Sequence, residues 1–96
     1  MEILVAYDVA TEKPEGQRRL RHVAQVCQNF GQRVQKSVFE CSVSEMQYEK
    51  LRRELLECID EAEDNLRIYR LQTPKDQFIE RYGVNRGVDF QGPLVV

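Results

Sequence analysis

The chain has 96 residues, of which 42% are hydrophobic and 31% are charged, and its formal net charge is −2. This length fits one small domain, and the composition is that of a globular chain and not of a disordered one. The net negative charge argues against a uniformly basic nucleic-acid-binding protein. Because a domain of this size leaves much of its surface in water, we expect association with a second copy.

The charges are distributed unevenly along the chain. Residues 1–12 carry three acids and no base, whereas residues 13–36 carry six bases and one acid. Residues 37–64 carry three bases and nine acids, and residues 65–96 carry five bases and three acids. Such segregation permits a local cationic surface for phosphate groups on a protein of acidic pI. Ordinary solvated helix faces are the alternative explanation.

The cysteines and the apolar segments argue against several classes of protein. Cys27, Cys41 and Cys58 are an odd number of thiols without a CxxC pair, which is typical of reduced cysteines in the cytosol. Together with His22 they number four potential zinc ligands, but their separations do not match those of structural zinc sites. No segment approaches the roughly 18 apolar residues of a membrane helix. We therefore expect a cytoplasmic protein without a membrane partner.

The first nine residues, MEILVAYDV, predict a buried strand, because the apolar run is too short to span a membrane. Asp8 lies at the end of this strand, directly after Tyr7. The strand therefore delivers one carboxylate to an edge of the fold. The spacing alone favours a modest role for Asp8, in which its side chain caps the following helix or turn.

A helix is predicted to follow, after a loop or first turn at residues 10–16. Apolar residues at spacings of three and four form one face of about four turns, and Gly31 is the expected end of the helix. The members of this face are Leu20, Val23, Ala24, Cys27 and Phe30.

The first turns of that helix are unusually cationic. Arg18, Arg19 and Arg21 oppose the helix dipole, which favours acids at a helix start by about 0.3–1 kcal/mol each. An anionic ligand would explain this arrangement. Pairing with Glu12 and Glu15, or simple exposure, is the alternative.

The middle of the chain predicts two strands and a second helix. Residues 32–43 alternate between apolar and polar side chains, with a turn or bulge at residues 35–37. Ser44 and Gln47 have the spacing of a capping box, so a helix begins there. The acidic run at residues 60–64 has the wrong sign for a helix C-terminus, and we expect it outside the helix or facing solvent.

The C-terminal third predicts one clear strand, at residues 65–71, and a further short strand at residues 77–82. The fold class is therefore α+β, a ferredoxin-like βαββαβ domain over residues 1–82 with an additional C-terminal strand. One face of such a sheet carries no helices, which predicts a homodimer. Residues 83–96 form an irregular tail whose apolar end we expect to dock on the dimer.

Little conventional catalytic chemistry is available to this chain. It has no GxGxxG, P-loop or HExxH motif, and His22 is the single histidine from which a catalytic triad could be built. The carboxylate of Asp8 remains. One aspartate holds Mg²⁺ or Mn²⁺ poorly, but a twofold axis would bring a second Asp8 to the same ion. The shared metal could then orient a water and polarise a phosphodiester, while arginines hold the phosphates.

Three segments resemble the CRISPR-associated Cas-two family over essentially residues 1–82. The most specific is Gly31–Cys41, with the sequence GQRVQKSVFEC. The others are Tyr7–Asp8–Val9 and the arginine-rich Arg18–Arg21. The ending Gly92–Pro93–Leu94, together with the NLRIY segment that precedes Arg70, is similar to the branch that accompanies type I-C systems.

The resemblance implies a homodimer that works with the Cas-one integrase to insert new spacer DNA into the CRISPR array. It also implies Mg²⁺- or Mn²⁺-dependent nuclease activity on DNA or RNA, with Asp8 as the catalytic metal ligand at the dimer interface. Phe39 is implied as support for the core or the interface. The positions implied to contact nucleic acid are Tyr7, Arg18, Arg19, Arg33 and Ser37.

Two functions of different classes stay open from the sequence. In the first, the chain is a metal-dependent endonuclease that uses Asp8 from both subunits. In the second, it is a non-catalytic scaffold whose arginines grip duplex DNA while the integrase performs the chemistry. A related ribonuclease toxin of the same fold is a weaker third alternative.

Overall fold

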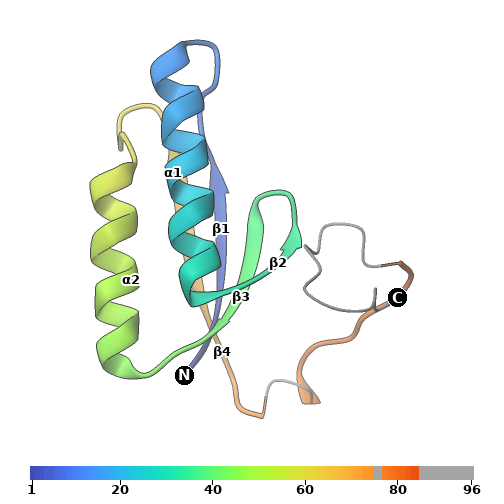
Figure 1. Ribbon diagram of the computed structural model, residues 1–96. Helices are drawn as coiled ribbons and strands as arrows, with labels where there is room; N and C mark the ends of the chain where they lie inside the picture. The colour runs from blue at the N-terminus through green and yellow to red at the C-terminus, as the bar shows by residue number, and fades with distance from the viewer. Residues whose placement is uncertain (75–76, 85–96) are drawn as a thin grey trace.

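The computed structural model describes residues 1–74 and 77–84, which form a four-stranded sheet and two helices (Figure 1). The strand order is β2-β3-β1-β4, and every neighbouring pair is antiparallel. Both helices cover one face of the sheet, so the ferredoxin-like prediction is confirmed. The elements are β1 (Glu2–Asp8), α1 (Pro14–Phe30), β2 (Gly31–Gln35), β3 (Val38–Ser42), α2 (Glu45–Cys58) and β4 (Asn65–Leu71).

The central strand β1 divides its side chains between two faces. Ile3, Val5 and Tyr7 point toward the helices and are 0%, 0% and 5% exposed. Because side chains alternate along a strand, Leu4 and Asp8 lie on the opposite face, which we call the open face. Asp8 is exposed and is directly opposite Asn65 of β4.

The hydrophobic core fills the space between the sheet and the two helices. Val23 and Cys27 of α1 meet Leu51 and Leu55 of α2, and all four side chains are 0% exposed. Each fully buried aliphatic side chain contributes about 1.5–3 kcal/mol relative to an exposed one. The core therefore holds β1, which lies between β3 and β4, against the two helices.

The ends of the helices follow local sequence signals. Ser44 and Gln47 form the predicted capping box of α2. Gly31 ends α1, as predicted, and its extended backbone with φ −163° leads directly into β2. A Cβ at this position would lie 2.3 Å from the carbonyl oxygen of Glu40. Gly31 is required because two backbones approach closely there.

The additional strand predicted at residues 77–82 is not formed in the part of the chain that the structure describes. Residues 77–84 contain only turns and irregular backbone, with Phe78 and Tyr82 exposed. A strand needs a hydrogen-bonded neighbour, and the sheet formed by the described residues ends at β2 on one edge and at β4 on the other. Arg81 instead forms a 3.6 Å ion pair with Glu40 of β3. The expected docking of the tail falls mainly on residues 85–96, which lie outside the described residues.

Neither described helix is long and apolar enough to cross a membrane. Cys27, Cys41 and Cys58 are free thiols, as predicted, and the first two are buried. Burial raises the pKa of Cys27 to about 12, and the neighbouring Cys41 and Cys58 act in the same direction. Cys27 is therefore a protonated thiol that fills the core at neutral pH.

Candidate metal and nucleic-acid site

Asp8 is the last residue of β1, and its side chain is exposed on the open face. The first residue of the next helix is Pro14, and Lys13 occupies the capping position without a side-chain hydrogen bond. Asp8 therefore does not cap α1, which was the alternative that the spacing favoured. In the described chain the Asp8 carboxylate forms no hydrogen bond or ion pair, so both of its oxygens are available to a ligand.

A hollow of about 450 Å³ lies beside Asp8, between the loop that follows β1 and the loop that precedes β4. Residues 8–12 form one wall, and residues 62–65 form the other. Among the described residues, no three acidic, histidine or cysteine side chains are close enough to hold one metal ion together. A metal at Asp8 would therefore need oxygen ligands from water, substrate or a second chain.

Tyr7 lies on the other side of the sheet from Asp8. Its hydroxyl donates to the carbonyl oxygen of Lys36 at 3.3 Å, and its backbone N–H donates to the carbonyl oxygen of Ser37 at 3.1 Å. Burial raises the pKa of Tyr7, and Cys27 adds to the rise, while Arg33 opposes both. In this structure Tyr7 faces the core and anchors the β2–β3 turn.

Phe39 connects Tyr7 to Arg33. The rings of Tyr7 and Phe39 are stacked with centroids 6.3 Å apart, and the Arg33 guanidinium lies 5.1 Å from the centre of the Phe39 ring. Phe39 is 0% exposed and belongs to the hydrophobic core, one of the two locations that the sequence left open for it. The Nε of Arg33 is buried without a hydrogen-bond partner in the described chain. The structure thus brings together four of the predicted residues near the end of β1, on the side of the sheet that faces the helices. They are Tyr7, Arg33, Ser37 and Phe39.

Arg19 is engaged with a residue that the sequence analysis did not single out. Its Nε and Nη2 donate to the two carboxylate oxygens of Asp64 at 2.8 and 3.2 Å. The Asp64 side chain is 0% exposed, and Arg19 is 20% exposed. The Arg19 hydrogen bond is the main reason why the pKa of Asp64 falls to about 2. The sequence gives no local signal for this pair, because its members are 45 residues apart.

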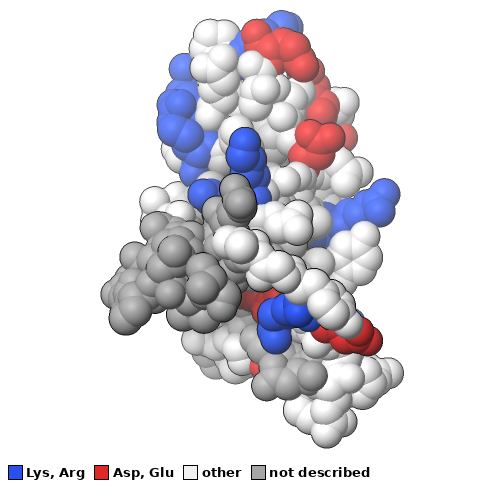
Figure 2. All heavy atoms as spheres, turned by 90° about the vertical axis from the view of Figure 1, so that its right-hand side faces the viewer, with Lys and Arg blue, Asp and Glu red and all other residues white. Residues whose placement is uncertain are grey.

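Arg18 is exposed on α1, and it belongs to a different face from Arg19. At spacings of three, four and seven along the helix it is followed by Arg21, His22 and Gln25, and all four residues are exposed. We call these four residues the α1 polar stripe. At the end of the molecule where α1 begins, Lys and Arg gather along one flank and Asp and Glu along the other (Figure 2). This separation provides a local cationic surface despite the net charge of −2.

The protein-family model described as CRISPR associated protein Cas2 matches residues 1–78. The chain belongs to the Cas2 family. This confirms the family resemblance seen in the sequence, whereas the type I-C branch stays a prediction. Within the Cas2 family, "CRISPR-associated endoribonuclease Cas2 1" of Moorella thermoacetica is 62% identical over 96 residues, covering 100% of both chains.

The names of the related Cas2 proteins differ, because some are called endoribonucleases and others endonucleases. "CRISPR-associated endonuclease Cas2" of Halalkalibacterium halodurans is 47% identical over 95 residues, covering 99% of each chain. The crystal structure of Streptococcus pyogenes Cas2 at pH 6.5 is 47% identical and has a TM-score of 0.77. It covers 86% of this chain and 100% of the other. The Cas2 fold is therefore shared at the level of both sequence and structure.

Proposed function

We propose that this chain is a CRISPR-associated endonuclease that cleaves phosphodiester bonds with a divalent metal ion held by Asp8. The observation that supports this most directly is the Asp8 carboxylate at the end of β1, which has no partner among residues 1–74 and 77–84, in a chain of the Cas2 family. The nuclease names of the relatives support the same reaction class. Their difference leaves both RNA and DNA as substrates of the proposed activity.

A homodimer would complete the site. The helices leave the open face uncovered, and Leu4, Ala6 and Val38 lie on it beside one another by register. A second copy packed on this face would bury these apolar side chains. By symmetry it would also bring its own Asp8 toward the same region, because an isologous interface uses the same surface on both subunits.

The donor chemistry of Asp8 fits Mg²⁺, with Mn²⁺ as an alternative. Mg²⁺ prefers carboxylate oxygens and usually combines one or two of them with water and substrate phosphates. When bound, the ion would polarise the phosphodiester and lower the pKa of a water molecule. The chain itself would contribute the orientation of Asp8, which lies opposite Asn65 in the pairing of β1 with β4.

The α1 polar stripe is the best candidate for contacts with backbone phosphates. Arg18 and Arg21 are exposed, so each can meet a phosphate without breaking an ion pair seen in the structure. The other predicted residues, Tyr7, Arg33 and Ser37, belong to the cluster around Phe39, on the side of the sheet that faces the helices. We propose that this cluster supports the edge of the site and that the exposed arginines bind the nucleic acid.

The second candidate function is a scaffold for duplex DNA during spacer acquisition, in partnership with the Cas-one integrase. The feature that favours it is the α1 polar stripe, which provides a phosphate-binding surface independent of Asp8. The two functions are compatible, because one surface could position the duplex whichever subunit performs the chemistry.

Cleavage by the purified Asp8→Asn variant tests the endonuclease proposal. The substitution keeps the size of the side chain but removes its charge, so Mg²⁺-dependent cleavage of RNA and DNA should be lost while binding remains. Glu61→Gln, an exposed acid in the loop before β4, is the matched control and should cleave normally. Wild-type cleavage rates in Asp8→Asn would refute the Asp8 mechanism.

The scaffold candidate is tested by reversing the charge of the stripe. Arg18→Glu together with Arg21→Glu should weaken binding of duplex DNA and reduce its salt dependence by about one unit of slope for each lost phosphate contact. If spacer integration in cells survives Asp8→Asn but not the charge reversal, the scaffold function is the physiological one. If integration survives the charge reversal, the stripe is not the DNA-binding surface.

A further inference from the structure

Asp64 joins three segments that meet near the end of β1. Its carboxylate accepts hydrogen bonds from the backbone N–H of Ala10 at 3.0 Å and from that of Asp60 at 2.9 Å. It also accepts two bonds from the Arg19 guanidinium of α1. One buried carboxylate therefore fixes the loop after β1, the loop before β4 and the first half of α1 relative to one another.

These attachments lie on both sides of Asp8. Ala10 is two residues beyond Asp8 along the chain, and Asn65, which follows Asp64, is paired with Asp8 across the sheet. A shift of Asp64 would therefore be transmitted to Asp8 through both β1 and β4. We call Arg19 and Asp64, with the backbone groups that they hold, the Arg19–Asp64 clasp.

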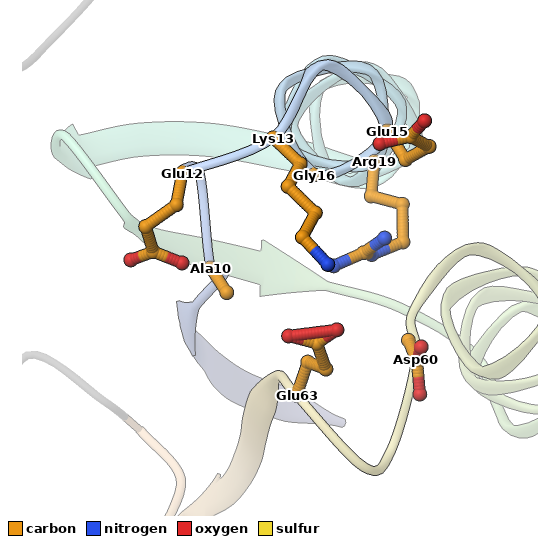
Figure 3. A pocket seen from close by; sticks show the side chains of 8 residues that line it. All are labelled: Ala10, Glu12, Lys13, Glu15, Gly16, Arg19, Asp60 and Glu63. Carbon is orange, nitrogen blue, oxygen red and sulfur yellow. The ribbon is translucent and has the colours of Figure 1, made fainter.

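The guanidinium of Arg19 is directed into the fold. Figure 3 shows the cationic ends of Arg19 and Lys13 pointing into one hollow between α1 and the loop before β4, with the Glu63 carboxylate pointing toward them. The hollow has a volume of about 250 Å³. Gly16 allows α1 to approach this region closely, because a Cβ there would lie 1.7 Å from the carbonyl oxygen of Ala10. Because Nε and Nη2 of Arg19 are both bound to Asp64, the guanidinium would have to give up this pair to present the same nitrogens to a phosphate.

We propose that Arg19 and Asp64 are positioning residues, which hold the end of β1 so that Asp8 has the geometry needed to bind metal, and that Arg19 is not a phosphate ligand. This inference rests on the proposed function, because the role assigned to the clasp is the orientation of Asp8. Residues that orient a metal ligand from behind typically change metal affinity or activity by about 10–100-fold when they are replaced.

The two roles for Arg19 predict that Asp64→Asn changes different kinetic constants. If Arg19 positions the strand, Arg19→Gln and Asp64→Asn break the same clasp, and both lower the affinity for Mn²⁺ and the kcat of cleavage by about 10–100-fold. KM for nucleic acid then changes little. If Arg19 binds phosphate, Asp64→Asn frees a cation and lowers KM, whereas Arg19→Gln raises it.

The decisive experiment combines these variants in the full chain. Mn²⁺ affinity, kcat and KM are measured for Arg19→Gln, Asp64→Asn, the double variant and Arg19→Lys, with Arg53→Gln, at an exposed arginine of α2, as the control. We expect the double variant to lose no more kcat than either single variant, because residues that act together are not additive. Arg19→Lys keeps the charge and should recover part of the loss. A lower KM in Asp64→Asn, or additive losses in the double variant, would overturn the clasp.

Amide hydrogen exchange tests the clasp without reference to cleavage. The backbone N–H groups of Ala10 and Asn65 should exchange faster in both Arg19→Gln and Asp64→Asn, while those of α2 keep wild-type rates. Unchanged exchange at Ala10 and Asn65 would refute the clasp even if cleavage were affected. Normal cleavage by Asp8→Asn would instead refute the proposed function, so the two failures are distinguishable.

Discussion

At the scale of single residues, the alternation of β1 separates two neighbours that the sequence treats as one motif. Tyr7 faces the helices and is 5% exposed, whereas Asp8 is exposed on the open face. The sequence predicted a carboxylate at a strand end, because an apolar run followed by an acid is a local signal. The sequence could not predict that Arg19 would form an ion pair with Asp64, because that pairing depends on how distant segments pack together.

Asp64 should make the stability of the protein sensitive to acid. Its pKa is about 2 in the folded protein against 3.8 for an unperturbed carboxyl, chiefly because Arg19 hydrogen-bonds to its charged form. A depressed pKa stabilises the fold above the unfolded value, and that stability is lost as pH falls from about 4 toward 2. Asp64 contributes at most about 1.4 kcal/mol per pH unit to the slope of the unfolding free energy against pH.

Urea unfolding measures this contribution. The measurement should run from roughly pH 5 to roughly pH 2, which spans the titration of Asp64. Asp64→Asn should be less stable at the upper end and should show a flatter profile below about pH 4. Glu61→Gln, whose parent residue is exposed, should follow the wild-type profile. A wild-type slope in Asp64→Asn would show that other carboxyl groups cause the acid sensitivity.

At the scale of elements, the local signals predicted where the helices and most strands lie. The capping box at Ser44 and the alternation over residues 65–71 are examples of signals that the structure confirms. The structural roles of two glycines were harder to predict from the sequence. Gly31 and Gly16 both stand where a neighbouring backbone approaches, and such proximity is visible only after the elements have packed.

Gly16→Ala should destabilise the protein although alanine is the better helix former. The gain in helix propensity is about 1 kcal/mol, but a Cβ at Gly16 would lie 1.7 Å from the Ala10 carbonyl oxygen. Relief of such overpacking typically costs about 1–3 kcal/mol, and here it must move backbone. Thermal unfolding should show a lower Tm for Gly16→Ala. Gln28→Ala, at an exposed position of α1, should be neutral or stabilising.

The same substitution connects the helix to the site. Displacement of Ala10 would disturb its 3.0 Å hydrogen bond to Asp64, so Mn²⁺ affinity should fall together with Tm. If Gly16→Ala were as stable as the wild type, the close approach of α1 to the loop after β1 would be incorrect.

At the scale of the whole molecule, both described helices lie on one face of the sheet, and the open face carries no helix from the described residues (Figure 1). The order of elements was enough to predict this arrangement, because two helices in a βαββαβ chain pack on the same side. The additional strand at residues 77–82 was not predictable in this way. Phe78, Ile79 and Tyr82 provide the apolar and aromatic side chains that are common in strands, yet a strand also needs a neighbour with which to pair.

Charge on the open face should prevent the proposed homodimer. Leu4 lies there opposite Glu40 and Tyr69, so Leu4→Lys would meet a carboxylate within its own chain and preserve the monomer fold. In a dimer, two buried lysines would face one interface at a large desolvation cost. Analytical ultracentrifugation should show dimers for the wild type and monomers for Leu4→Lys.

Met46→Lys provides the control, because Met46 is 83% exposed on α2 and lies on the helical side of the molecule. This variant should remain dimeric. A Leu4→Lys protein that sediments as the wild-type dimer would show that the open face is not the interface.

The most direct test of the account is the binding of Mn²⁺ to the intact protein, measured by electron paramagnetic resonance at neutral pH. If two copies of Asp8 share one ion, the wild type should bind one Mn²⁺ for every two chains, and Asp8→Asn should lose that site while keeping its fold and its dimeric state. Equal Mn²⁺ binding by the wild type and Asp8→Asn would contradict the assignment of Asp8 as the metal ligand.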